Sequence, residues 1–200
     1  MVRAVIFDFY GVWVPDVLGG YVESEQDPSL KQLLANEVAA YYQGRNDLEH
    51  IAGTLKFKCN RFDVDVNKMT LRETDIGAEL VTFLRNLHGH FLKLGVVANL
   101  GVMENELLKN FNAHQQLFEV IASPLSLNLF LPLLSEEFFA AALQTLGEPP
   151  KSCLAISGNA EYRQFAESIG MQSLPFEGLP KLEQAINNIL LSDTPGVAPS

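Results

Sequence analysis

The chain of 200 residues carries 14 basic and 24 acidic side chains, and 48% of its residues are hydrophobic. This length supports one substantial core with a smaller appended element and excludes two large domains. The acidic balance excludes nucleic acid and anionic membrane as expected partners. No signal peptide or membrane-spanning run is recognisable, and the two distant cysteines, Cys59 and Cys153, suit a reduced compartment, so a cytoplasmic protein is expected.

The first predicted element is a strand over residues 2–8, which reads Val-Arg-Ala-Val-Ile-Phe-Asp. Its apolar run is typical of a strand that is buried on both faces. The strand ends at Asp8, and Gly11 lets the chain turn away. Ligands of open α/β sheets bind beyond the carboxyl ends of the strands, so Asp8 is the first candidate site residue. The alternative is that Asp8 merely caps a turn.

Residues 15–75 predict an all-helical insertion after this strand. An irregular connector is expected over residues 15–26, which contain two adjacent glycines. The pair Asp27-Pro28 is a typical helix start, and apolar residues continue from there with helical spacing to residue 43. A second helix is predicted from Asp47, followed by short helix and loop over residues 60–75.

From residue 75 onward, strand and helix patterns alternate. Strands are predicted over residues 92–98, 117–122, 153–156 and 171–176, and helices over residues 80–87, 104–111, 135–146, 160–169 and 179–191. This alternation predicts an α/β fold with a Rossmann-like, doubly wound parallel sheet and right-handed crossovers. The tail over residues 192–200 is rich in Pro and is expected to be disordered.

The run Asp8-Phe9-Tyr10-Gly11-Val12 resembles the first motif of the haloacid dehalogenase superfamily, Asp-x-Asp-Gly-Thr/Val-Leu. The resemblance implies that Asp8 is a nucleophile and that Tyr10 replaces a second Asp, which serves as general acid/base. It covers almost the whole chain in strand order and motif spacing. It implies a core over residues 1–14 and 76–191 and a small helical cap over residues 15–75, as in haloacid dehalogenases, sugar-phosphate phosphatases and the amino-terminal domain of some epoxide hydrolases.

The remaining motifs of the superfamily are largely replaced in this chain. The second motif is a Ser or Thr, usually followed by Asn, and here it reads Ala98-Asn99. The third is a Lys, often before Pro, and Leu131 stands in its place. The fourth is an acidic loop that holds magnesium, and the resemblance puts Gly158 and Tyr162 at the positions of its two acids.

These replacements predict a catalytically impaired member of the superfamily, a pseudoenzyme that binds a small molecule or a protein partner. Aspartyl phosphatases bring a phosphate dianion against a carboxylate, which requires magnesium and a Lys to suppress the repulsion. Asp8 alone is a poor magnesium site, so no resident cofactor is expected, and at most weak Mg²⁺ binding.

The alternative is an active hydrolase, phosphatase-like or dehalogenase-like, that uses Asp8 as nucleophile with Tyr10, Asn99 or Asn159 as supporting groups. Haloacid dehalogenases also carry Tyr two residues after the nucleophile and a metal-free fourth motif of the Ser-Ser-Asn type, to which Ser157-Gly158-Asn159 is similar. They keep the Ser of the second motif and the Lys of the third, however, and Ala98 and Leu131 count against this alternative.

Overall fold

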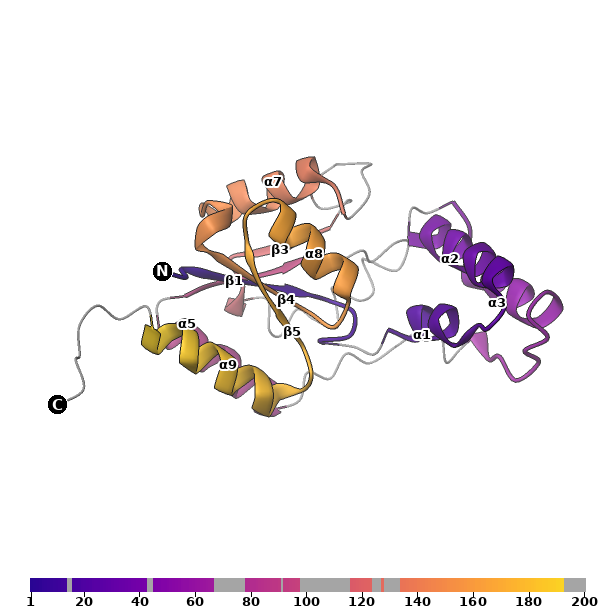
Figure 1. Ribbon diagram of the computed structural model, residues 1–200, viewed down its shortest axis with the longest axis horizontal. Helices are drawn as coiled ribbons and strands as arrows, with labels where there is room; N and C mark the ends of the chain where they lie inside the picture. The colour runs from indigo at the N-terminus through magenta and orange to yellow at the C-terminus, as the bar shows by residue number, and fades with distance from the viewer. Residues whose placement is uncertain are drawn as a thin grey trace. The chain divides into compact units, whose positions relative to one another are not determined.

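The protein is described by a computed structural model that covers residues 1–13, 16–42, 45–66, 78–90, 92–97, 116–123, 127 and 134–192. Five parallel strands form one sheet in the order β3-β2-β1-β4-β5 (Figure 1). The strands are β1 (Ala4–Asp8), β2 (Lys93–Val97), β3 (Val120–Ala122), β4 (Cys153–Ser157) and β5 (Gln172–Pro175). The predicted fold class, a doubly wound parallel sheet with helices inserted after the first strand, is confirmed.

Strand β1 is the centre of the sheet, and all five of its residues are buried, as are those of β4. The register pairs Asp8 with Val97 and Phe7 with Ile156, so β1, β2 and β4 end at the same edge. The chain runs from β1 to β2 and β3 on one side and then returns to β4 on the other. The switch point of the sheet therefore lies between β1 and β4, where open α/β sheets bind their ligands.

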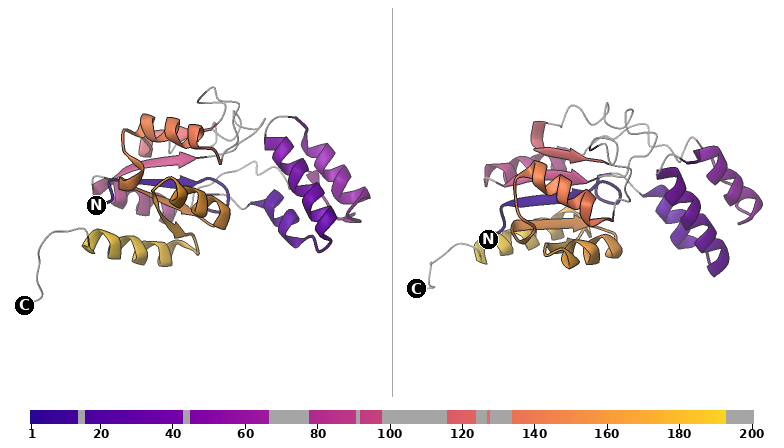
Figure 2. Two further views of the ribbon diagram at one scale, coloured as in Figure 1. Left: turned by 45° about the horizontal axis from the view of Figure 1, so that its top comes forward. Right: turned by 90° about the horizontal axis from the view of Figure 1, so that it is seen from above.

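Helices cover both faces of the sheet (Figures 1 and 2). Helices α5 (Ala78–Gly89) and α9 (Leu179–Ser192) lie on one face, and α7 (Glu136–Leu146) and α8 (Ala160–Ser168) lie on the other. Helix α7 begins and ends as predicted, because the Ser135 hydroxyl accepts a hydrogen bond from the Phe138 amide and Gly147 ends the helix with φ of +70°. The face of α7 and α8 packs into a core that contains Phe138, Phe139 and Tyr162.

The helices that follow β1 belong to a second compact unit. They are α1 (Val17–Ser24), α2 (Pro28–Tyr42) and α3 (Leu48–Phe57), and they share an apolar core of their own. Both predicted helix starts are confirmed: the Asp27 carboxylate accepts from the Ser29 and Leu30 amides, and the Asp47 carboxylate accepts from the His50 amide. The predicted domain boundaries, and the role of this unit as a cap, stay predictions.

The predicted irregular connector over residues 15–26 is wrong, because these residues contain helix α1. The Asp16 carboxylate accepts from the Gly19 amide at 2.8 Å, and Leu18 is buried in the core of the second unit. A Cβ atom at position 19 would collide with the Asp16 carboxylate. The glycine that argued against a helix is thus what allows this cap to close.

Further sequence expectations differ from the structure or lie outside it. Strand β3 is shorter than the predicted 117–122, and residues 116–117 form a 3-10 turn instead. The predicted helix over 104–111 and the tail over 193–200 lie outside the described residues, and α9 continues to Ser192. Among the described helices, none has the length and apolar character that crossing a membrane requires.

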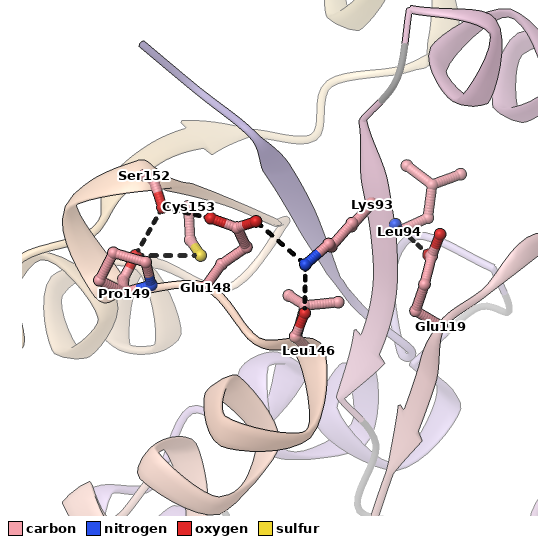
Figure 3. A network of polar contacts seen from close by, with 8 residues as sticks. All are labelled: Lys93, Leu94, Glu119, Leu146, Glu148, Pro149, Ser152 and Cys153. Carbon is pink, nitrogen blue, oxygen red and sulfur yellow. Dashed lines mark hydrogen bonds and ion pairs between the residues drawn. The ribbon is translucent and has the colours of Figure 1, made fainter.

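The amino edge of the sheet is joined by a polar network that connects β2, β4 and the end of α7 (Figure 3). The Lys93 ammonium lies 3.0 Å from Glu148 Oε1 and donates to the Leu146 carbonyl at 3.0 Å. The Ser152 hydroxyl donates to Glu148 Oε2 at 3.1 Å. The Glu148 side chain is only 9% exposed. The hydrogen bond from Lys93 holds the pKa of its carboxyl below its usual range. This network lies at the opposite edge from Asp8.

Candidate functional site

The candidate site is built around Asp8, the last residue of the central strand. Asp8 is only 8% exposed, and it follows a run of fully buried apolar residues. A buried carboxylate is costly unless hydrogen bonds or charges compensate it. The polar groups that contact Asp8 therefore determine the chemistry that is available at this edge of the sheet.

Ser157, the last residue of β4, is one of the partners of the carboxylate. Its hydroxyl donates to Asp8 Oδ2 at 2.6 Å, and the Ser157 side chain is completely buried. The same hydroxyl oxygen accepts from the Asn159 amide at 2.9 Å. Because this hydroxyl accepts from a backbone amide, its own proton is directed to Asp8, as in the short hydrogen bonds typical of charged acceptors.

Asn159 holds the start of helix α8 behind this pair. Its side-chain oxygen accepts from the Glu161 amide at 2.8 Å and from the Tyr162 amide at 3.4 Å, so Asn159 is the N-cap of α8. The positive end of the helix dipole begins three residues after Ser157, a placement that favours negative charge. The side chain of Asn159 thus caps the helix, while its backbone amide donates to the Ser157 hydroxyl.

Arg163 holds the other side of Ser157. Its Nη1 donates to the Ser157 carbonyl at 2.8 Å, and the Phe176 amide donates to the same carbonyl at 3.2 Å. The carbonyl and the hydroxyl of Ser157 are therefore both bonded, which fixes the residue next to Asp8. Sequence reasoning missed Arg163, and only its position on the first turn after the N-cap could have drawn attention to it.

A tight turn at Gly11 brings the loop after β1 close to the loop after β4. Gly11 has φ of +77°, a conformation that favours glycine, and the Trp13 amide donates to the Phe9 carbonyl at 3.0 Å. A Cβ atom at Gly158 would lie 3.9 Å from the Gly11 carbonyl oxygen. The structure thus brings together five of the predicted site residues: Asp8, Gly11, Ser157, Gly158 and Asn159. Tyr10 follows Asp8 in the same turn, half-buried, with its ring edge-on to Phe9 at 5.3 Å.

Tyr162, which the sequence places where a magnesium acid is expected, lies in the apolar core. It is 1% exposed, and its ring centroid lies 5.5 Å from that of Phe139. Its hydroxyl has no hydrogen-bond partner in the described part of the chain. Burial, and secondly the Asp8 charge, raise the pKa of this phenol well above its usual value. Tyr162 is therefore a neutral phenol near the Asp8 carboxylate, and it has no partner among the described residues.

The described residues near Asp8 offer few ligands for a divalent cation. Mg²⁺ takes oxygen ligands in octahedral geometry, commonly from carboxylates. The described residues contain no group of three or more His, Cys, Asp or Glu side chains that could hold a metal ion. Gly158 offers no side-chain oxygen, and Tyr162 offers a neutral phenol. The predicted site residues Ala98, Asn99 and Leu131 lie outside the described residues.

No protein-family model and no curated protein matches the chain, whereas solved structures do. A predicted HAD-like family hydrolase from Porphyromonas gingivalis is 18% identical, with a TM-score of 0.61 over 95% of this chain and 98% of that one. The β-phosphoglucomutase from Clostridium difficile is 16% identical, with a TM-score of 0.54 over 96% of this chain and 100% of that one.

The L-2-haloacid dehalogenase from Xanthobacter autotrophicus, with chloropropionic acid covalently bound, is also similar. It is 18% identical, with a TM-score of 0.55 over 100% of this chain and 85% of that one. The chain therefore has the haloacid dehalogenase-like fold over nearly its full length, as the sequence resemblance implied. At these identities the likeness concerns the fold.

Proposed function

We propose that the chain is a haloacid dehalogenase-like protein with a binding role, in which magnesium-dependent phosphoryl transfer is impaired. The observation that carries the proposal is the set of groups around Asp8. The Asp8 carboxylate is paired with the Ser157 hydroxyl, and the two positions at which the resemblance expects metal acids hold Gly158 and Tyr162. Under this proposal, residues 15–75 form the cap, and the ligand is a small molecule or a protein.

The physical argument is one of charge. A phosphate dianion that approaches a carboxylate needs cations to suppress the repulsion, and preorganised charges of this kind contribute about 10²-fold or more to the rate. The position of the third-motif lysine holds Leu131. The Ser157 hydroxyl stabilises the Asp8 charge without neutralising it. Phosphoryl transfer on Asp8 would therefore lack both of its usual sources of positive charge.

The test is hydrolysis of a broad panel of phosphate esters with Mg²⁺ or with a chelator. Wild type, Asp8→Asn and the matched control Glu161→Gln are compared, because Glu161 is an exposed acid on the first turn of α8. We expect the same background rate in all three proteins, with no dependence on Mg²⁺. Turnover that requires Mg²⁺, survives in Glu161→Gln and disappears in Asp8→Asn would overturn the proposal.

A second candidate function is metal-free hydrolysis with Asp8 as the nucleophile, of the dehalogenase type. The hydrogen bond from Ser157 to Asp8 favours it, because a hydroxyl donor keeps a carboxylate ionised without a metal. Tyr10 also supports it, because haloacid dehalogenases carry Tyr two residues after the nucleophile. The test is halide release from 2-chloropropionate by wild type and Asp8→Asn. Release that depends on Asp8 and persists with a chelator would establish this function in place of the binding role.

A further inference from the structure

Helix α3 of the second unit exposes a phenylalanine on the face that points away from its own core. The buried residues of α3, Ile51, Ala52 and Leu55 among them, share one side of the helix. Helical spacing puts Phe57 on the opposite side, and it is 77% exposed, more than any other large apolar side chain that the structure describes. An aromatic ring in water contributes little to the folding of the chain that carries it.

The exposure of Phe57 follows from an ordered turn at the end of α3. The Lys58 amide donates to the Thr54 carbonyl at 2.9 Å. The Arg61 amide donates to the Leu55 carbonyl, also at 2.9 Å. Because Leu55 is fully buried in the core of the unit, these hydrogen bonds fix the backbone on both sides of Phe57 and hold its ring outside.

Gly53, one turn before Phe57, leaves space on the same face. Residues four apart are neighbours on a helix surface, and a Cβ atom at Gly53 would meet no other residue within 4 Å. Glycine in a helix interior is less favourable than alanine. Neither a close contact nor a positive φ requires glycine at this position. Gly53 thus leaves the backbone of α3 open to the close approach of another molecule beside Phe57.

Two lysines flank the exposed ring. Lys56 and Lys58 precede and follow Phe57, and neither ammonium group forms an ion pair with a carboxylate of the described residues. The nearest acids in sequence are Glu49, two turns earlier on α3, and Asp63, which lies beyond the turn. The end of α3 therefore combines an aromatic ring with unpaired positive charge, a combination complementary to apolar and acidic residues of a partner.

We propose that the α3 docking face, formed by Gly53, Lys56, Phe57 and Lys58, binds a short acidic segment of a partner protein. An apolar side chain of the segment packs on Phe57 and over Gly53, and its carboxylates pair with the two lysines. An anionic membrane suits this face less well, because its surface repels a chain of net charge −10. A short peptide carries few charges, and at physiological ionic strength it meets mainly the charges within about 8 Å.

The test titrates the full chain with three pooled libraries of dodecapeptides. The pools share the same randomised apolar positions, and the positions between them hold Asp and Glu, Lys and Arg, or Ser and Asn. Vesicles that contain phosphatidylserine are the fourth probe. Binding is followed by NMR through the backbone amides of Gly53, Lys56 and Phe57. We expect the acidic pool alone to shift these amides, and the shifts to decrease as salt is added.

Variants of the α3 docking face separate its parts. Phe57→Ala should weaken binding of the acidic pool about tenfold, as the loss of an aromatic hot spot does. Lys56→Gln together with Lys58→Gln should remove the preference for the acidic pool. Gly53→Leu should block binding and leave the urea midpoint unchanged or higher, which shows that this variant folds. The matched control is Leu191→Ala, because Leu191 is also 74% exposed, and it should keep binding within twofold.

Equal responses to the three pools would overturn the proposal, as would a stronger response to the vesicles than to the acidic pool. Shifts that appear without peptide as the protein concentration rises, and that vanish in Phe57→Ala, would assign the face to a second copy of the chain and overturn the proposal as well. If a variant does not fold, the comparison of the probes on wild type still decides. The site does not involve Asp8, so this proposal and the proposed function are tested independently.

Discussion

The Ser157 hydroxyl donates to Asp8 Oδ2 at 2.6 Å, although the two residues are 149 positions apart in sequence. They meet because β1 and β4 are neighbouring parallel strands that end at the same edge. Between these two strands the order in which the chain adds strands to the sheet reverses. Without the Ser157 hydroxyl, the buried Asp8 carboxylate would have one hydrogen-bond donor fewer. This hydrogen bond thus joins the two neighbouring strands at the point where Asp8 lies.

Ser157→Ala is expected to lower the free energy of unfolding by about 1–3 kcal/mol, because it removes a buried donor from a carboxylate. Urea unfolding measures the change. The matched control is Ser173→Ala, since Ser173 also donates to a carboxylate, that of Glu167, at 2.6 Å, but at an exposed position. The control should change stability by less than about 0.5 kcal/mol. Equal effects of the two substitutions would show that burial does not strengthen the bond to Asp8.

Local patterns explain which features could be predicted from sequence. Asp8 at the end of an apolar run and the helix starts at Asp27, Asp47 and Ser135 depend on residues within a few positions of one another, and all four lie where expected. Helix α1 could not be predicted, because Gly19 and its neighbour Gly20 lower helix propensity while tertiary packing of Leu18 compensates.

The details of the site depended on contacts between elements that are distant in sequence. The loop with Ser157 could be assigned to the site, but the direction of its hydroxyl follows from the pairing of β1 and β4. Arg163 is the exception, because it lies six residues after Ser157 and reaches the Ser157 carbonyl from the first turn of α8. The core position of Tyr162 depends on Phe139 of helix α7. The relationships of Ser157 with Asp8 and of Tyr162 with Phe139 cannot be derived from sequence spacing.

Lys93→Met is expected to destabilise the protein by about 1 kcal/mol, because Glu148 at the amino edge loses its cation (Figure 3). Lys181→Met is the matched control, since Lys181 and Glu177 form an exposed pair, and it should have little effect. Urea unfolding of both variants at neutral pH measures the difference. An equal effect of the two substitutions would mean that the Lys93 pair behaves as an ordinary surface pair.

The effect of Lys93→Met should also depend on pH. The hydrogen bond from Lys93 is the main cause that holds the pKa of Glu148 below 4.5 in the folded state. A lowered pKa contributes stability that is present above the unfolded value and lost as the pH falls through the folded one. The stability difference between wild type and Lys93→Met should therefore shrink as the pH is lowered below 4.5. A difference that stays constant there would contradict this assignment.

One of the two cysteines is expected to be inert in the folded protein. Cys153 is fully buried, and its burial, with a smaller contribution from Glu148, raises the pKa of its thiol to about 11. Cys59 is half-buried. A thiol-specific reagent at neutral pH should label Cys59 alone, and Cys153 only after denaturation. The control is Cys59→Ser, which should show no labelling while folded; labelling of this variant at native conditions would contradict the prediction.

Alkaline pH should destabilise the second unit through Tyr41. Burial raises the pKa of Tyr41 from 10.0 to about 12. A raised folded-state pKa gives stability that is complete below the unfolded value and declines as the pH rises through the folded one. Stability should therefore decline between pH 10.0 and about 12, and less steeply in Tyr41→Phe. Urea midpoints across this range measure the slopes, and parallel slopes would rule out Tyr41 as the titrating group.

Tyr162→Phe is expected to leave the free energy of unfolding unchanged or to raise it by about 1 kcal/mol. The substitution keeps the ring contact with Phe139 and removes a buried hydroxyl that has no partner among the described residues. Tyr162→Leu is the comparison that loses the aromatic ring, and it should destabilise by about 1–3 kcal/mol. Thermal and urea unfolding of the two variants separate the ring from the hydroxyl. A loss of stability in Tyr162→Phe as large as in Tyr162→Leu would show that the hydroxyl stabilises the fold itself.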